Sequence, residues 1–347
     1  PLAGRIAAAL SRGRPVDLCG YLPVHDGQTR RGGIPVTAPT SPLRAFATSP
    51  YVLLTLCFLF WSGNSVFARG AADVMPPMNL AFLRWGVGII VLFPFAIRPL
   101  WRDRAIYVRH WKIFLIIALA GVTGFNSLIY HAVQHTTAIH ATLITAAVPA
   151  ASVIASWLAY RETISWRTAL AMMVAFVGVL VVISNGEFGV LASFAFNSGD
   201  LIAVLAVISW TIYSVGLRAM PRGTNPMGFL LGVMIVGWIF LVPFYVYDIS
   251  TGTHAALTVG NVAGVLYLGV FASVVAFAFF NFGVARLGAN RANVFNYLAP
   301  IFSGVLAVVF LGETLEWFHG ASIVLIFGGI YLAQRARGRT PHAAKAS

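Results

Sequence analysis

Hydrophobic residues are arranged along this chain in ten long runs, each separated from the next by a short polar connection. Each run is close to the ~20 residues that an α-helix needs to cross ~30 Å of hydrocarbon. Several connections contain Gly, Pro or Asn, as expected between closely packed neighbouring helices. The pattern predicts an all-α integral membrane protein with ten transmembrane helices, at about residues 50–68, 78–97, 112–131, 138–158, 168–185, 199–217, 227–247, 261–283, 289–311 and 318–334.

The pattern also repeats within the chain. Residues Ala138–Trp166 and Ala289–Trp317 follow the same order at a constant shift of 151 positions (289 − 138 = 151). In each stretch an apolar run contains one internal proline, Pro149 or Pro300, and then ends at a Glu-Thr pair. A constant shift of this kind indicates duplicated architecture.

The duplication covers most of the apolar region. The first and sixth runs match at a shift of 149 positions (210 − 61 = 149), which places Trp61 on Trp210. Repeated halves in so apolar a chain are typical of transporters that bind their solute near mid-membrane between the halves. We therefore predict two five-helix repeats around a central cavity, at residues 49–185 and 186–335.

Five helices per repeat is an odd number, so the second repeat must be inverted relative to the first. The distribution of charge agrees. With the N-terminus inside, 21 of the 23 Lys and Arg residues fall in cytoplasmic segments; of the other two, Arg69 falls outside and Arg84 within the second run. The positive-inside rule then predicts that both termini are cytoplasmic. We expect the chain to lie in the inner (plasma) membrane.

Composition changes the picture little. Hydrophobic residues make up 59% of the chain and charged residues only 10%, against about 25% charged in soluble proteins. The net charge of +13 lies in tails and short loops, so no nucleic-acid partner is expected. We interpret residues 1–48 as a basic, disordered cytoplasmic tail without a cleavable signal peptide, and 336–347 as a second basic tail.

Several motifs together resemble those of a known family. The motifs are WSGNSVFAR at residues 61–69, LRW at residues 83–85, and the endings RET and GET after the two proline-containing runs. With ten helices in two inverted repeats, they are similar to the drug/metabolite transporter superfamily, EamA-type branch. The resemblance spans about residues 50–334. It implies alternating access around a cavity lined by helices 1, 3, 4, 6, 8 and 9, and small organic solutes, often amino acids and often exported.

Polar and aromatic side chains deep in the runs are the candidate site, because polar groups in hydrocarbon usually face the bundle interior or a wet cavity. Indole and phenol rings offer stacking surface and a donor, and amides can bind amino or carboxylate groups. Packing between helices and, for the tryptophans, an interfacial belt are the alternatives. The candidate substrate-binding residues are Trp61, Asn64, Tyr130, His140, Thr145, Trp210, Tyr213, Asn281, Asn293, Asn296 and Tyr297.

Two prolines are candidate hinges. Pro149 and Pro300 lack a backbone N–H, so each can open a helix turn beside the cavity. A static kink that aids packing is the alternative. His131, His135 and His140 are close in sequence, but no Cys, Asp or Glu joins them, and we expect no metal site.

The charged residues near the runs are interpreted as structural. Arg84 lies inside the second run, where we expect it to anchor the helix to carbonyls near the outer rim or to pair with Asp73, rather than to contact solute. Glu162 and Glu313 precede the fifth and tenth runs, where a carboxylate can cap a helix N-terminus. No acidic residue lies deep within a run.

These observations favour a carrier. Proton and sodium coupling usually need an acid within the membrane, so we expect facilitated movement, with His140-linked proton coupling as the alternative. No nucleotide-binding motif or paired catalytic acids are present, so ATP-driven pumping and an intramembrane enzyme are disfavoured, and no cofactor is expected. We predict a monomeric exporter of amino acids in the lipid bilayer. The alternatives are export of drugs or other metabolites, including nucleotide-sugar-like solutes; the lack of several deep Lys or Arg residues argues against a bulky anionic solute.

Overall fold

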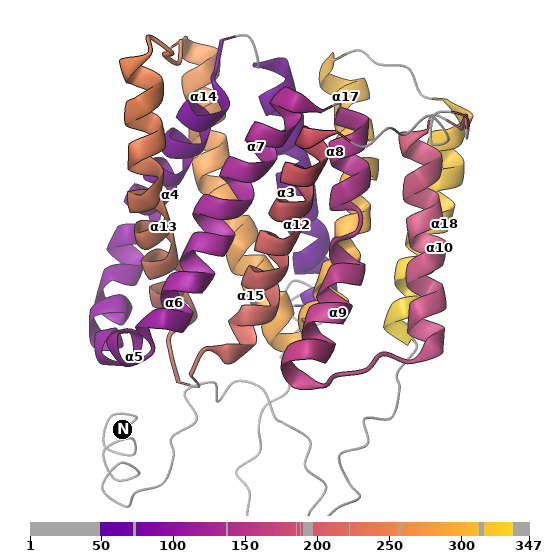
Figure 1. Cartoon of the computed structure of the whole chain (residues 1–347), viewed down its shortest axis with the longest axis horizontal. Coiled ribbons are helices and arrows are strands. Elements are labelled where there is room, and N and C mark those ends of the chain that lie inside the picture. Colours follow the sequence, from indigo (N-terminus) through magenta and orange to yellow (C-terminus); the bar gives the residue numbers. More distant parts are fainter. Residues whose placement is uncertain are drawn as a thin grey trace, which may run out of the picture.

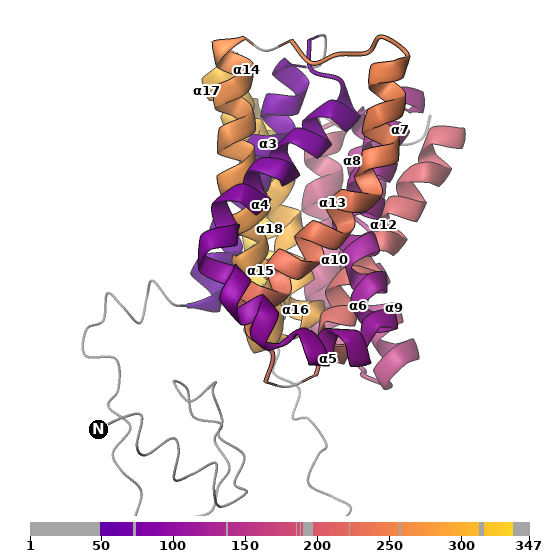
Figure 2. The ribbon, with the colours of Figure 1, turned by 90° about the vertical axis from the view of Figure 1, so that its left-hand side faces the viewer.

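The computed structural model describes residues 49–71, 74–136, 138–184, 186–187, 189, 197–221, 223–256, 258–311 and 316–335, and no strand is present among them. The helices run side by side along a common direction (Figures 1 and 2). In the first repeat they are α3 (Pro50–Gly70), α4 (Pro77–Arg102), α5 (Arg104–Arg109), α6 (Trp111–Ala118), η1 (Leu119–Gly124), α7 (Phe125–His135), α8 (Ala138–Thr145), α9 (Val148–Tyr160) and α10 (Trp166–Ile183). In the second they are α12 (Ser198–Gly216), η2 (Leu217–Ala219), α13 (Pro226–Ser250), α14 (Val259–Tyr267), η3 (Leu268–Val275), α15 (Ala276–Leu287), α16 (Ala289–Val294), η4 (Phe295–Tyr297), α17 (Leu298–Leu311) and α18 (Trp317–Arg335).

The outer surface of this bundle is apolar. Within the described residues, nine helical spans are long and apolar enough to cross a membrane, and α10 is a shorter apolar helix that supplies the tenth. Large hydrophobic side chains such as Phe95 and Phe310 are more than 70% exposed on the outside, where lipid would cover them. The ten predicted spans are confirmed, and the chain is an all-α, multi-pass membrane protein.

Helix interruptions occur at matching places in the two repeats. The third span widens into the π-helical segment η1 and the eighth into η3. The fourth and ninth spans each break, at Ala146–Ala147 and at η4, before a helix whose first turn contains Pro149 or Pro300. Proline fits the first turn of a helix because the missing N–H has no partner there. We predicted one run in each place, with a turn that the proline opens or kinks; the regular α-helix is interrupted just before each proline.

Packing between helices follows the inverted repeat. Helix α3 packs against η3, α15 and α17, and its counterpart α12 packs against η1, α7 and α9. The second and seventh spans, α4 and α13, pack against each other, as do α10 and α18 at one edge of the bundle (Figure 1). The first and sixth spans are therefore the central elements of the fold.

Several helix ends are held by side chains. Asn197 and Asp200 form a capping box at the start of α12, and Asn225 caps α13. The expected capping of α10 by Glu162 is wrong. Glu162 pairs with Arg218 instead, because an extended segment separates it from the first turn, where the Oγ of Ser165 accepts the N–H of Thr168. Its repeat counterpart Glu313 lies outside the described residues, as do the two tails.

Basic side chains collect at one end of the bundle, which we name the Arg161 end. Seven of them lie over aromatic rings there, in cation–π pairs that include Arg104 with Trp101, Arg161 with Trp157 and Arg335 with Tyr331. Exposed tryptophans and arginines are typical of a membrane interface. We name the opposite end, where α3 ends beside Ala71 and α7 ends at His135, the Ala71 end.

Candidate functional site

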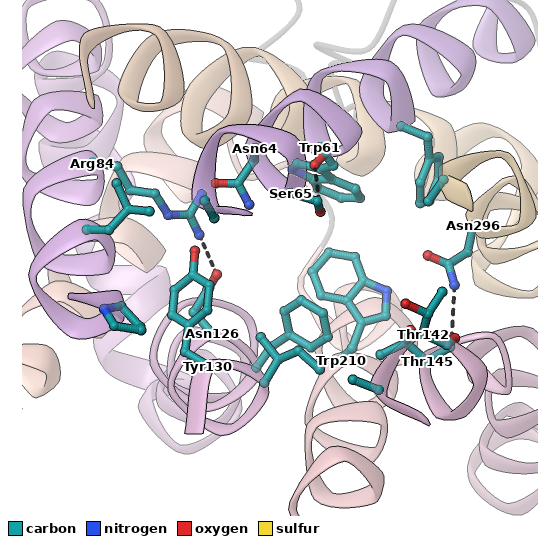
Figure 3. A pocket seen from close by; sticks show the side chains of 18 of the residues that line it. Trp61, Asn64, Ser65, Arg84, Asn126, Tyr130, Thr142, Thr145, Trp210 and Asn296 are labelled. Atoms are coloured by element: carbon teal, nitrogen blue, oxygen red, sulfur yellow. Dashed lines mark hydrogen bonds between the residues drawn. The ribbon is translucent and has the colours of Figure 1, made fainter. Parts of the chain in front are cut away.

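A cavity of about 470 Å³ lies between the two repeats, where the first and sixth spans cross (Figure 3). Its wall extends to Ala68, Met75 and Pro77 at the Ala71 end. The other residues that line it are Phe58, Trp61, Asn64, Ser65, Leu80, Arg84, Phe125, Asn126, Ile129, Tyr130, Ala141, Thr142, Thr145, Val148, Trp210, Phe277, Asn296 and Ala299. This volume lies within the range of small-molecule sites.

Two repeat-related tryptophans form the floor of the cavity. The rings of Trp61 and Trp210 meet edge to face, with centroids 5.1 Å apart. Phe277 packs edge to face against both. The indole N–H of Trp61 donates to the carbonyl of Ala272, which belongs to the π-helical segment η3. Both tryptophans therefore line the cavity, and the interfacial-belt alternative does not apply to them.

A second repeat-related pair lies beside the tryptophans. The amide Nδ2 of Asn296 donates a 3.0 Å hydrogen bond to the backbone carbonyl of Thr145, at the break between α8 and α9. The two positions are equivalent under the shift of 151 (296 − 145 = 151). The interruption of the helix thus leaves a backbone carbonyl for a side chain of the other repeat to bond at the cavity wall, as in other transporters with discontinuous helices.

The opposite wall carries a buried cation. The guanidinium of Arg84 donates to Oδ1 of Asn126 and, at 3.4 Å, to Oγ of Ser273. We expected Arg84 to bind backbone carbonyls at the outer rim; its partners are side chains, because α7 and η3 both pack against α4 at this depth. The other expected partner, Asp73, lies outside the described residues. Figure 3 shows Arg84, Asn64, Asn126 and Tyr130 grouped on this side.

Below the cavity, towards the Arg161 end, a hydrogen-bonded network joins the helices. The Oδ1 of Asn293 accepts from the indole N–H of Trp210 at 3.1 Å. Its Nδ2 donates to the hydroxyls of Ser152 at 2.6 Å and Ser214 at 2.9 Å. Asn293 is fully buried, so this network satisfies the whole amide and ties α9, α12 and α16 together.

Tyr213 and Asn281 form a further bond in the same region. The Tyr213 hydroxyl donates to Oδ1 of Asn281 at 2.7 Å. Gly121 in η1 lets the Tyr213 ring approach, since a Cβ at that glycine would lie 2.2 Å from Cδ2 of the ring. Together with the Asn293 network and the Glu162–Arg218 pair, this bond joins the helices below the cavity.

The structure separates the predicted site residues into two groups. Six line the cavity, namely Trp61, Asn64, Tyr130, Thr145, Trp210 and Asn296. Four lie outside the cavity lining, namely Tyr213, Asn281, Asn293 and Tyr297, so solute contact by them stays a prediction. The side chain of His140 lies outside the described residues. Pro149 and Pro300 both follow helix breaks beside the cavity, and their role as hinges stays a prediction.

Sequence reasoning missed part of the lining. Phe58, Phe125 and Phe277 are apolar residues in apolar runs and give no signal that separates them from the rest. Asn126 and Ser65 are deep polar residues of the kind used to choose candidates. Arg84 was assigned a structural role, although an intramembrane cation is by default a sign of function.

These features define a class: a multi-pass membrane protein built from two inverted five-helix repeats around a central cavity. Residues 48–184 and 197–334 each match the EamA-like transporter family. The chain belongs to that family, within the drug/metabolite transporter superfamily, and is therefore a transporter rather than an enzyme. A solved crystal structure shares the fold, with a TM-score of 0.70 at 19% identity over 84% of this chain and 99% of that one.

Two curated relatives are similar along almost their whole length. An uncharacterized transporter of Archaeoglobus fulgidus is 25% identical over 286 residues, which cover 81% of this chain and 96% of the relative. The uncharacterized transporter YyaM of Bacillus subtilis is 20% identical over 283 residues, covering 82% and 92%.

Proposed function

We propose that this chain carries small organic metabolites across the plasma membrane by alternating access. The observation that supports it is the contrast between the two ends of the cavity. At the Ala71 end the cavity wall reaches the helix ends. At the Arg161 end the repeat counterparts of four cavity residues are joined by hydrogen bonds, Tyr213 to Asn281 and Asn293 to Ser214. An inverted repeat can exchange these two arrangements by moving one repeat against the other around a fixed site.

Orientation follows from the charges. The basic and aromatic belt lies at the Arg161 end, and the positive-inside rule assigns that end to the cytoplasm. Single-cysteine variants test this proposal in intact cells, in a Cys19→Ser, Cys57→Ala background. An impermeant maleimide should label Thr253→Cys, at the Ala71 end, and spare Arg104→Cys in α5. The reverse pattern would overturn the assignment.

Amino acids are the solute class that we propose first, moved outward and without a coupling ion. Amide and hydroxyl groups of the lining suit amino and carboxylate groups. Among the described lining residues none is acidic or a histidine, which supports uncoupled movement. Proton-coupled export of drugs or other metabolites is the alternative.

Solute counterflow in proteoliposomes tests the proposal. A panel of labelled amino acids should show saturable exchange that a pH gradient leaves unchanged. Trp61→Ala protein serves as the control, because it removes half of the tryptophan floor. Exchange that requires the gradient would overturn the uncoupled mechanism. A panel of amino acids and other metabolites without any exchange would overturn the carrier itself.

A further inference from the structure

The cavity wall contains one charge. Arg84 is the only charged side chain among the described residues that line it, and the residue is 2% exposed. A buried, unpaired charge is strongly unfavourable in an apolar setting, so such groups are normally paired. In a transporter, an intramembrane cation of this kind marks a ligand or ion path.

The contacts of Arg84 with other described residues do not neutralise it. Both described hydrogen-bond partners, Asn126 and Ser273, are uncharged. Its Nε is buried and has no partner among the residues that the structure describes, and the guanidinium lies 4.9 Å from the centroid of the Trp85 ring. A guanidinium presents donors in a planar fork that matches a carboxylate.

Further unused groups surround this cation. The hydroxyl of Tyr130 and Oδ1 of Asn64 are both buried and have no hydrogen-bond partner in the part of the chain that the structure describes. Both side chains line the cavity on the Arg84 side (Figure 3). Buried polar groups in native proteins are almost always satisfied. A bound anion would accept from Tyr130 and Arg84. The Oδ1 of Asn64 is itself an acceptor, so it would need a donor group of the solute instead.

The neighbouring wall is aromatic. Trp61 and Trp210 form the floor, and Phe58, Phe125 and Phe277 surround them. Rings of this kind bury an apolar or aromatic body well. Because the described lining contains no acidic side chain, it offers no countercharge for an ammonium group.

We propose that the solute of this carrier is a small carboxylate with an apolar or aromatic body. Arg84 and Tyr130 bind the carboxylate, and the Trp61–Trp210 floor binds the body. The proposal rests on the carrier function and deepens it: the carboxylate is required for recognition, whereas the amino group of an amino acid is dispensable. One cation also limits the solute to one main anionic group, in agreement with the argument against bulky anions.

Three probes with the same aromatic body test this proposal by calorimetric binding to the full chain in detergent. They are 3-phenylpropanoate, the neutral 3-phenylpropanamide and the cationic 2-phenylethylamine. The wild type should bind the carboxylate about tenfold or more tightly than the amide, as expected for a charge-assisted hydrogen bond, and the amine no more tightly than the amide. Equal binding of carboxylate and amide, or no binding of the carboxylate, would overturn the proposal.

Substitutions assign the preference to Arg84. Arg84→Gln should lose the carboxylate preference, and a cooperative thermal unfolding transition in detergent shows that the variant is folded. Arg84→Lys, with the charge but without the fork, should be intermediate. A preference that survives in Arg84→Gln would overturn the assignment. A carboxylate preference that is absent from the wild type but present in Asp73→Asn would also overturn the assignment, because Arg84 would then form an ion pair with Asp73 in the wild type.

This experiment and the counterflow assay fail separately. Carboxylate-selective binding without exchange of any solute would leave the anion site standing and overturn the carrier function. Solute exchange without carboxylate-selective binding would support the carrier function and overturn the anion site.

Discussion

The hydroxyl of Tyr213 donates a 2.7 Å hydrogen bond to Asn281, whereas the residues at the equivalent positions of the other repeat have buried polar atoms that no described residue bonds. Asn64 is the counterpart of Tyr213 at the shift of 149, and Tyr130 is the counterpart of Asn281 at the shift of 151. The repeats thus carry the same pair of residue types, exchanged between their helices. Tyr213 and Asn281 are hydrogen-bonded below the cavity, whereas Tyr130 and Asn64 line the cavity and are not bonded to each other. In an alternating carrier, each of the two conformations would form one of these two bonds.

Removal of one hydroxyl should therefore shift the balance between the two conformations in a direction that depends on the repeat. Tyr213→Phe removes a bond of the present state, and Tyr130→Phe removes one that only the opposite state would make. A membrane hydrogen bond contributes about 0.6–1 kcal/mol, so the ratio of the states should change about threefold to fivefold.

Repeat-related cysteines can report this shift. Ser65 is exposed in the cavity and its counterpart Ser214 is fully buried. In the cysteine-free background, Tyr213→Phe should raise the labelling rate of Ser214→Cys and lower that of Ser65→Cys. Tyr130→Phe should do the reverse. Shifts in the same direction for both variants would contradict the exchange of bonds.

The Asn293 network should contribute much of the stability of the closed end. Asn293→Ala leaves the Trp210 indole N–H and two hydroxyls without their partner. A buried donor left unsatisfied costs about 1–3 kcal/mol, which should appear as a lower thermal unfolding midpoint in detergent. Asn290→Ala is the matched control, because Asn290 makes one described bond, to Ser156, in a partly buried site. Equal losses in the two variants would contradict a special role for Asn293.

Much of this fold could be predicted from the sequence. The lengths of the hydrophobic runs indicate the helices, and a duplication of five helices, an odd number, indicates the inverted topology. The positions of Trp61 and Trp210 in the cavity followed from the same duplication. The helix breaks beside Pro149 and Pro300 could be predicted only in part, since a proline pattern does not distinguish an opened turn from a static kink.

The division between open and closed ends could not be predicted. Tyr213 and Asn293 have the same residue types and depth as cavity residues, and only the relative position of the two repeats decides whether they contact solute or each other. The error on Glu162 has a different cause. Its position before an apolar run fits a cap, but the partner that competes for it, Arg218, is 56 positions away in sequence.

Close approach of Tyr213 to η1 leads to another prediction. Gly121→Ala places a methyl group 2.2 Å from the Tyr213 ring, so the ring or the π-helical segment must move. Overpacking of this kind costs about 1–3 kcal/mol and should lower the thermal midpoint and raise labelling of Ser214→Cys. Gly320→Ala is the control, because a Cβ there meets nothing within 4 Å and alanine favours helix. A Gly121→Ala protein as stable as Gly320→Ala would contradict this packing argument.

Asp103 should make stability depend on pH at the Arg161 end. Burial raises the pKa of this carboxyl, but the hydrogen bonds from Arg102 and from the backbone N–H of Asn225 outweigh it and hold the pKa below its usual value. The carboxylate thereby joins the end of α4 to the start of α13. Arg102 is largely exposed, so solvent screens part of its contribution.

The sign of the effect follows from the lowered pKa. A carboxyl whose pKa is lower in the folded state stabilises that state at pH values above the unfolded pKa of about 3.9. This contribution is lost as the pH falls through the folded value. At pH 7 the thermal midpoint of Asp103→Asn should lie below that of the wild type, and the gap should shrink as the pH is lowered below about 4. A gap that stays constant or widens on acidification would show that the Asp103 carboxylate does not hold the two helices together.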